Sequence, residues 1–268
     1  MFGVVALAAE STVTQPHRAI NITAASSISL PTNNTEHSVL RFGLYYPHLT
    51  PYIYTEPSHN QVVGIVPEVL APFFAQQGIT IEYVFDKVSA LERRLHNNDI
   101  DMMILNASWA INPEQVLFSD GIVPYNDYLY SRSKQQQILE PEQLDNKTIC
   151  TRQYYVYPKL AALFTADLAV RVDSSSQAAQ LRMLFSNRCD YAYINEIIAK
   201  WELQKQFMGQ QVYLSAVYQD ESMLTLAVSQ KWQQLLPELN QFLQQQQQSG
   251  EINRVINQYV KYDYGYNK

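Results

Sequence analysis

Residues 67–85 read P-E-V-L-A-P-F-F-A-Q-Q-G-I-T-I-E-Y-V-F, and this stretch decides the fold. Up to Gln77 the apolar side chains recur at helical spacing, and Gly78 stands where a helix C-cap belongs. From Ile79 onward apolar and polar residues alternate, which is typical of a strand. A helix that ends at a glycine and leads directly into a strand predicts a repeated α/β unit.

Further elements surround this unit in a regular order. A strand is predicted at 39–45, an amphipathic helix at 90–97 and a short buried strand at 101–105. The order strand, helix, strand, helix, strand predicts a parallel sheet covered by helices. We therefore expect two α/β lobes of similar plan, because the order returns with strands at 148–151, 169–172 and 191–194 and helices at 157–166 and 175–185.

Two extended stretches, 127–133 and 222–229, separate and follow the repeats. We interpret them as crossings between the lobes, which is what a hinged two-lobe protein needs. The tail from 233 to 262 is predicted to be helical, with an interruption at Ser249 and Gly250. Its glutamine-rich part is interpreted as a solvated helix face.

The composition excludes several classes of protein. Of 268 residues only 8 are glycine, and their spacing contains no dinucleotide, phosphate-binding or nucleophile-elbow motif. The net charge is -6, and the 19 Lys and Arg residues form no basic stripe, so a nucleic-acid partner is not expected. No spacing of His and Cys fits a zinc site, and we expect neither a metal nor a cofactor.

The cysteines and the N-terminus bear on the compartment. Cys150 and Cys189 leave a disulfide open, although two small buried thiols are the favoured interpretation. Residues 1–9 are apolar with an A-L-A stretch, which we interpret as the remnant of a secretory signal. Residues 10–37 are rich in Ser, Thr and Asn and are interpreted as a flexible tether. No apolar run reaches the ~18 residues of a membrane span.

Several short motifs follow one another in a fixed order: L-R-F-G at 40–43, P-Y at 51–52, G-I-V-P-E-V-L at 64–70, L-E-R-R-L-H-N-N-D-I-D-M-M at 91–103, F-S-D at 118–120, P-Y at 124–125, L-R-M-L-F-S-N-R-C-D-Y-A at 181–192 and S-G-E-I at 249–252. Together they resemble the type 3 extracellular solute-binding proteins, the periplasmic amino-acid-binding family with the type II periplasmic binding fold. The resemblance covers roughly residues 38–262.

The resemblance implies an α/β protein of two lobes joined by two hinge strands, with a small-molecule solute enclosed between them. Lobe 1 would comprise 38–130 plus 222–268, and lobe 2 would comprise 131–221. Members of the family usually deliver solutes to membrane transporters, so an ABC-type permease is the expected partner of a periplasmic monomer. Other relatives serve as sensor domains, which implies a membrane receptor as the alternative partner.

Three positions depart from the pattern of the family. A lobe 1 arginine usually clamps the ligand carboxylate, and Gln115 holds that position here. A lobe 2 aspartate usually takes the ligand ammonium, and here the position is Asn195, with Glu196 beside it. The lobe 2 turn at 150–155 contains no glycine. An α-amino acid in the usual pose is therefore not expected, unless Arg152 and Glu196 supply the missing charges.

Aromatic side chains gather near these positions. Rings of Tyr and Trp suit sugars, aromatic compounds, peptides and cations. For Tyr154 and Tyr155, lining the site and packing on the lobe surface both stay open, as do an anion contact and a surface salt bridge for Arg152. Tyr46 and Tyr54 are expected to pack in the core or at the rim. The predicted ligand-binding residues are Tyr52, Ser108, Trp109, Asn112, Gln115, Arg152, Tyr154, Tyr155, Asn195 and Glu196.

Binding without catalysis is the expected function. One alternative is a ligand sensor that acts in trans on a membrane receptor. The other is an enzyme on the same scaffold, such as a dehydratase of the cyclohexadienyl type. An enzyme of that kind needs a positioned acid or base. Glu114 and Glu196 are the obvious carboxylates near the predicted site.

Overall fold

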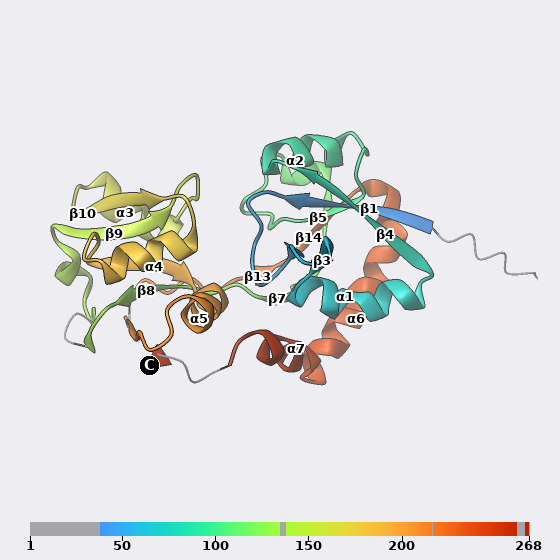
Figure 1. The fold of residues 1–268 in the computed structure, drawn as a ribbon. Coiled ribbons are helices and arrows are strands. Elements are labelled where there is room, and N and C mark those ends of the chain that lie inside the picture. The colour runs from blue at the N-terminus through green and yellow to red at the C-terminus, as the bar shows by residue number, and fades with distance from the viewer. Residues whose placement is uncertain (1–37, 135–137, 216, 262–265, 268) are drawn as a thin grey trace, which may run out of the picture. The chain divides into compact units, whose positions relative to one another are not determined.

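The computed structural model describes residues 38–134, 138–215, 217–261 and 266–267 of the chain. All of them belong to one unit, His37–Lys268. The interpreted signal remnant at 1–9 and tether at 10–37 lie outside the described residues. Figure 1 draws the strands of two large sheets together with the helices that accompany them.

The first sheet is built around β1. Its strand order is β4-β1-β5-β14-β6. β1 runs parallel to β4 and to β5, whereas β14 runs antiparallel to β5 and to β6. The strands are β1 (Ser38–Tyr45), β4 (Ile79–Asp86), β5 (Met102–Ile104), β6 (Leu117–Phe118) and β14 (Leu226–Val228), and the flanking helices are α1 (Ile65–Gln76) and α2 (Val88–His96).

Helices cover this sheet on both faces because alternate residues of β1 point to opposite sides. Leu40 and Phe42 pack with Phe73 of α1 in one buried cluster. Tyr45 packs with Leu91 of α2 in another. Figure 1 shows α1 and α2 on opposite sides of the β1–β4 pair. The predicted helix and strand of 67–85 are thus the first layer of a three-layer lobe.

The second sheet repeats this arrangement. Its strand order is β10-β9-β11-β8-β12-β15, and β9, β10 and β11 are parallel. Ala192 and Ile194 of β11 pack with α4, and Tyr191 and Tyr193 pack with α3. The elements are β8 (Asp127–Ser131), β9 (Lys147–Arg152), β10 (Ala169–Ser174), β11 (Tyr191–Asn195), β12 (Val212–Leu214), β15 (Tyr266–Asn267), α3 (Pro158–Thr165), α4 (Gln177–Phe185) and α5 (Glu196–Lys205).

The predicted α/β class is confirmed, but the sheets are mixed and not purely parallel. The two extended stretches form antiparallel strands. In the second sheet β8 runs antiparallel to β11 and β12, and in the first sheet β14 runs antiparallel to β5. The strand β8 pairs within the second sheet, although we placed residues up to 130 in lobe 1. The strand β15 also pairs within the second sheet. Hydrophobic alternation identifies a strand without its partner, which is why the sequence missed these pairings.

Short elements complete the structure. The predicted helical tail consists of a 3-10 helix and two α-helices, and Gly250 separates the α-helices with a φ of 77°. A glycine is suited to this left-handed position. The elements not yet given are the strands β2 (Tyr54–Glu56), β3 (Gln61–Val63), β7 (Val123–Pro124) and β13 (Met223–Leu224), the 3-10 helices η1 (Pro113–Gln115), η3 (Pro141–Leu144) and η4 (Gln230–Leu235), and the α-helices α6 (Leu236–Gln248) and α7 (Glu251–Tyr259).

A disulfide joins Cys150 to Cys189, with 5.7 Å between their Cα atoms. The favoured interpretation of two free thiols is therefore wrong. The pairing of β9 with β11 sets Ala192 beside Cys150 and brings the two cysteines within bonding reach. Both are buried in the apolar layer under α4. A sequence separation of 39 residues gives no hint of this proximity.

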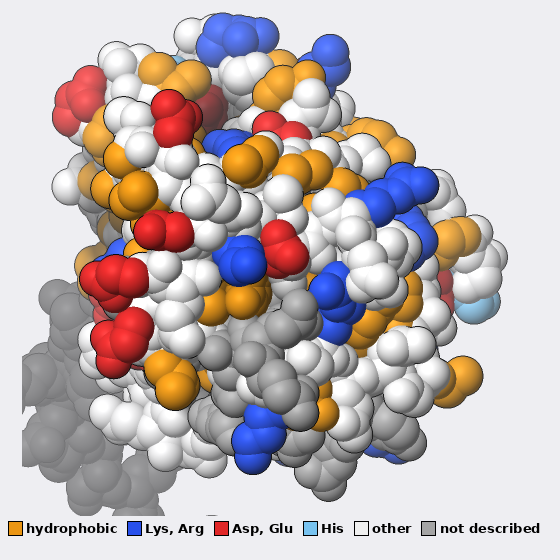
Figure 2. Space-filling model, turned by 90° about the vertical axis from the view of Figure 1, so that its left-hand side faces the viewer, with side chains coloured by type: hydrophobic (Ala, Val, Ile, Leu, Met, Phe, Trp, Pro, Cys, Tyr) orange, Lys and Arg blue, Asp and Glu red, His pale blue; other side chains and the backbone are white. Residues whose placement is uncertain are grey.

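On the face drawn in Figure 2, Lys and Arg side chains are interspersed with Asp, Glu and uncharged residues. No helix in the described part of the chain combines the length and the apolar character that crossing a membrane requires.

Candidate ligand-binding site

The start of α1 fixes the backbone around Tyr52. The amide N–H groups of Ile65 and Val66 donate to the carbonyl oxygens of Pro51 and Tyr52, at 3.1 and 2.9 Å. Gly64 allows this close approach with a φ of 132°. A Cβ atom there would lie 2.6 Å from the Tyr52 carbonyl oxygen. Helix α1 therefore holds the loop that carries this predicted site residue.

Tyr52 connects the first lobe to a crossing and to the second sheet. Its hydroxyl donates toward the carbonyl oxygen of Pro124 at 2.8 Å and the Oδ1 atom of Asn195 at 2.9 Å. The side chain is fully buried. Burial raises the pKa of Tyr52 well above its usual range, so the hydroxyl stays a donor. The predicted residues Tyr52 and Asn195 are thus in direct contact.

Asn195 and Glu196 both have protein partners. The Asn195 Oδ1 atom also accepts from the Ile198 N–H at 3.1 Å, which caps α5, and its Nδ2 atom donates to the Asn126 carbonyl oxygen at 3.2 Å. The Glu196 carboxylate lies 2.6 Å from the ammonium of Lys200, one helical turn away. These groups position α5 and Tyr52, and their contact with a ligand stays a prediction.

Trp109 belongs to a row of rings beside Tyr52. Its ring centroid lies 5.4 Å from that of Tyr125, which lies 5.4 Å from that of Tyr52. Trp109 is 44% exposed, whereas Tyr125 and Tyr52 are buried. An exposed ring at the end of a buried row is a surface on which a ligand could stack.

The other predicted residues of the first lobe lie on the exposed loop around η1. Ser108 uses its amide and its hydroxyl to donate to the Oδ1 atom of Asn106, at 2.9 and 2.8 Å. Asn112 precedes η1, and its carbonyl oxygen accepts from the Gln115 amide at 3.1 Å. Gln115 is exposed. These residues follow or precede Trp109 closely in the sequence and lie on the same loop. Their contact with a ligand stays a prediction.

The turn after β9 is stable without glycine. Tyr154 adopts a left-handed φ of 68° and is exposed. The Arg152 amide donates to the Tyr157 hydroxyl at 2.9 Å, and the Arg171 Nη2 atom donates to the Tyr155 carbonyl oxygen at 3.0 Å. A tyrosine hydroxyl and an arginine thus bind the turn where the family has small residues.

Arg152 lies 5.8 Å from the centroid of the Tyr155 ring. Burial raises the pKa of Tyr155, the charge of Arg152 opposes that rise, and the charge of Asp127 adds to it. Tyr155 is therefore close to both charged groups and half-buried. Tyr154 is exposed to solvent. Tyr46 is also exposed, at 73%, so it does not pack in the core, and its place at the rim stays a prediction.

Sequence reasoning missed Asp127, which stands at the first position of β8. Its Cα partner is Asn195, and a backbone bridge joins it to Asp220. Burial, and then the charge of Asp220, raises the pKa of Asp127 to about 8. The charge of Asp127 in turn raises the pKa values of several tyrosines: Tyr52, Tyr125, Tyr155, Tyr157 and Tyr193. The available signal was a single carboxylate opening the otherwise uncharged strand D-Y-L-Y-S.

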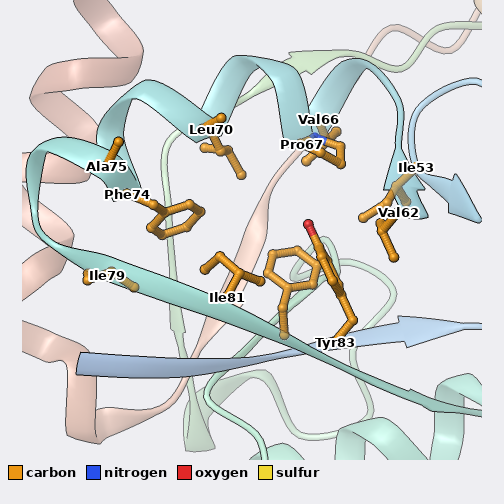
Figure 3. A pocket seen from close by; sticks show the side chains of 12 residues that line it. Ile53, Val62, Val66, Pro67, Leu70, Phe74, Ala75, Ile79, Ile81 and Tyr83 are labelled. Atoms are coloured by element: carbon orange, nitrogen blue, oxygen red, sulfur yellow. The ribbon is translucent and has the colours of Figure 1, made fainter. Parts of the chain in front are cut away.

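A cavity of about 350 Å³ lies elsewhere, between α1 and β4. Figure 3 shows its lining, with Leu70, Phe74 and Ile81 around it and the Tyr83 hydroxyl as a polar group. Burial raises the pKa of Tyr83 to about 12. None of the predicted ligand-binding residues lines this cavity. It is an apolar space inside the first lobe and lacks the convergent polar groups of a solute site.

No group of three or more His, Cys, Asp or Glu side chains that could hold a metal ion occurs in the described part of the chain. What the geometry offers is a set of rings and one acidic pair near the crossings. Such a set can stack on, bury and neutralise a small organic molecule. Two α/β lobes joined by two crossings, with these residues beside them, define a two-lobe binding protein.

Residues 43–262 match the family model of bacterial extracellular solute-binding proteins, family 3. The match spans most of the chain, and the chain belongs to this family. The resemblance that the motifs indicated is thereby confirmed. No curated protein matches the chain in sequence.

Solved structures share the fold. The periplasmic VFT2 domain of Bordetella pertussis BvgS superposes with a TM-score of 0.65 at 18% identity, covering 84% of this chain and 94% of that chain. Substrate-binding domain 2 of Lactococcus lactis GlnP superposes with a TM-score of 0.63 at 16% identity, and the match covers 85% of this chain and 97% of that chain. An ancestral cationic amino acid solute-binding protein superposes with a TM-score of 0.66 at 16% identity, and the match covers 84% of this chain and 96% of that chain. The predicted two-lobe periplasmic binding fold is confirmed.

Proposed function

We propose that this protein is exported and encloses one small solute between its lobes for delivery to an ABC-type transporter. The observation that carries the proposal is the group of tyrosines around Asp127. Tyr52 and Tyr125 come from the first lobe and its crossing, and Tyr155 and Tyr193 come from the second lobe. A site built from both lobes is what a hinge-closing binding protein requires.

The periplasm is the proposed location. The disulfide between Cys150 and Cys189 favours an oxidising compartment, since such bonds are rare in the cytosol. Membership of an extracellular solute-binding family supports the same location. The proposed partner is a membrane permease, in line with the substrate-binding protein of an amino acid ABC transporter among the similar structures.

The proposed ligand is not an α-amino acid in the pose that the resemblance implies. Gln115 carries no charge, and Asn195 is neutral and already bound to Tyr52 and α5. A buried ligand carboxylate or ammonium would therefore lack a charged partner at these two positions. The polar groups that stay available lie at Asp127 and around Arg152.

Binding without catalysis is also part of the proposal. The most obvious candidate base, Glu196, pairs with Lys200 in α5. Glu114 lies on the exposed η1. Neither of these two carboxylates lines a cavity described for the structure, which supports binding over the dehydratase-like alternative that we based on them.

A ligand search tests the function. The purified protein is denatured, and the released small molecules are identified by mass spectrometry. Thermal shift and calorimetry then follow with amino acids, sugars, short peptides, polyamines and aromatic acids. We expect one class of solute to raise the melting temperature in proportion to ln(1 + [L]/Kd). If no solute of any class binds, the binding function is wrong.

Trp109→Ala and Leu168→Ala form a matched pair of variants for the same assay. Both side chains are apolar and 44% exposed, but only Trp109 joins the ring row with Tyr125. We expect Trp109→Ala to weaken solute binding about tenfold, or about 1.4 kcal/mol. Leu168→Ala should leave the affinity unchanged. Equal effects of both variants would remove the ring row from the site.

A further inference from the structure

Two carboxylates at the crossings are not used by any contact described so far. The Asp127 amide donates to the Asp220 carbonyl oxygen at 2.8 Å, and the Asp220 amide donates back at 2.9 Å. Antiparallel residues that exchange such bonds carry their side chains on the same face. Burial and the charge of Asp220 are the influences on the Asp127 carboxyl, and within the described residues it has no hydrogen-bond or ion-pair partner. Both side chains are partly open to solvent.

The neighbours of Asp127 in the sheet do not neutralise it. On one side lies Asp220, and on the other side its cross-strand partner is Asn195. The Asn195 amide is occupied by Tyr52 and by the cap of α5. The charge that acts on the Asp127 carboxyl is that of Asp220, which is negative, whereas Arg152 and Arg171 act on the neighbouring tyrosines. A carboxylate in such a place is costly until a cation joins it.

An unpartnered hydroxyl lies on the same face. Tyr193 is 1% exposed, and its hydroxyl has no hydrogen-bond partner among the residues that the structure describes. Its Cα partner is Leu129, two residues along β8 from Asp127, so the two side chains are diagonal neighbours. The charges of Asp127 and Asp220 act on this hydroxyl and, after burial, raise the pKa of Tyr193 further. A buried hydroxyl without a partner points to a missing ligand.

Tyrosine rings complete the surroundings. Asp127 acts electrostatically on Tyr125 of the crossing and on Tyr155 and Tyr157 of the lobe 2 turn. The rings of Tyr157 and Tyr193 meet edge to face, with 5.4 Å between their centroids. Aromatic faces attract organic cations, and the attraction grows where water is excluded. Carboxylates and rings together select a positively charged group.

We propose that the carboxylates of Asp127 and Asp220, enclosed by these tyrosines, form the subsite for a cationic group of the solute, an ammonium or a guanidinium. The inference deepens the proposed function and rests on it, because the cation is part of the enclosed solute. N–H donors of the cation bind the two carboxylates and reach the Tyr193 hydroxyl as an acceptor. An anionic group disfavours the ionised form of the carboxylates, and a neutral sugar brings no positive charge to stabilise that form.

Calorimetry with paired probes tests the subsite. The cationic probes are 1,4-diaminobutane, spermidine and arginine, and butane-1,4-diol is the neutral counterpart of the first. We expect at least one cation to bind and the diol to fail. Asp127→Asn keeps the shape of the side chain and should weaken cation binding at least about tenfold. Asp99→Asn, on an exposed turn after α2, is the matched control and should change nothing.

Proton release provides a second readout. Near pH 7 the proton on Asp127 must leave when a cation takes its place, because the free protein has a pKa of about 8 there. The titratable groups around it are Asp220 and the tyrosines at 52, 125, 155, 157 and 193, and the tyrosines stay neutral at this pH. Arg152, Arg171 and Glu196 act on the same tyrosines and keep their charges at this pH. Binding enthalpies in buffers of different ionisation enthalpy should report close to one proton released. Asp127→Asn should release none.

The outcomes separate the subsite from the function. If only neutral or anionic solutes bind, and Asp127→Asn binds them as the natural protein does, the cationic subsite is wrong and the binding function stands. If no solute binds in the wider search, both are wrong. Circular dichroism and the melting temperature establish that each variant is folded before its affinity is compared.

Discussion

Two neighbouring strand ends meet at the crossings, and they differ in how their polar groups are used. At the end of β11, Asn195 and Glu196 are engaged by Tyr52, Ile198 and Lys200. At the start of β8, directly opposite, Asp127 has backbone partners, but its carboxylate has no hydrogen-bond or ion-pair partner among the residues that the structure describes. The two ends face each other in one sheet, with Asn195 buried and Asp127 partly open to solvent.

The contrast shows that a residue's place in a motif does not fix its role. The resemblance pointed to residue 195 as a ligand contact, and the structure uses that amide to cap α5 and to hold Tyr52. The neighbouring strand supplies the carboxylate of Asp127, for which we propose a contact with the solute. Changes at the β11 end should therefore act on stability, whereas changes at the β8 end should act on binding and on pH dependence.

The largest effect is expected for Asn195→Ala. The change removes the cap of α5 and leaves the buried hydroxyl of Tyr52 with Pro124 as its only acceptor. Loss of a cap costs about 1 kcal/mol, and loss of a buried hydrogen-bond partner costs a further 1–2 kcal/mol. Urea unfolding should show a decrease of about 2–3 kcal/mol in the free energy of unfolding.

Asn195→Asp is the matched variant, because it keeps an acceptor for the Ile198 amide and the Tyr52 hydroxyl but sets an oxygen against the Asn126 carbonyl and a carboxylate beside Asp127. Its stability loss should be smallest at low pH, where the new carboxyl is protonated, and should grow as the pH rises. A stability loss below about 0.5 kcal/mol for the alanine variant would contradict a structural role for this amide, since caps alone exceed that value.

A smaller loss is expected for Glu196→Gln. The glutamine keeps an oxygen near the Lys200 ammonium but loses the charge, and Lys200 is nearly buried. We expect a loss of about 1 kcal/mol, measured by urea unfolding at neutral pH, because part of the pair remains open to water. Solute affinity measured by calorimetry should change far less than in Asp127→Asn. A selective loss of affinity without loss of stability would place Glu196 in the site instead.

The sequence predicted the layered part of the fold well, for a physical reason. In 67–85 the helical period ends at Gly78 and a period of two begins at Ile79, so the order of elements can be read directly. The antiparallel entry of β8 and β14 was not predicted, because a pattern of apolar residues carries no information on pairing partners. The disulfide was missed for the same cause: it depends on the register of β9 against β11.

The site was only partly predictable. Tyr52, Trp109 and Tyr155 were expected near the site, and the structure places each beside other rings or charges. Asp127 was not expected, because a lone carboxylate at a strand end looks like a surface charge. Its setting depends on Asp220, which is distant in sequence and joins it only through the crossing. Residues that gain a role from such a distant partner are hidden from local patterns.

The smallest stability effect, and the one that tests the contrast most directly, is expected for Asp127→Asn. The folded protein holds the pKa of Asp127 at about 8, above the ordinary value of about 3.9 in an unfolded chain. Between these values the folded state keeps a proton that the unfolded state has lost. The free energy of unfolding therefore falls as the pH rises from about 4 to 8.

The asparagine does not titrate, so its advantage over aspartate should be absent near pH 4 and grow to about 1 kcal/mol at pH 8. This stability difference is smaller than the one that follows from the full pKa difference between the folded and unfolded states. The reason is that the Asp127 side chain is partly open to water, which screens its charge. Urea unfolding of both proteins at pH 5 and pH 8 measures it. A variant that is less stable than the natural protein at pH 8 would mean that Asp127 already has a stabilising partner. The two strand ends would then be alike, and the cationic subsite would lose its basis.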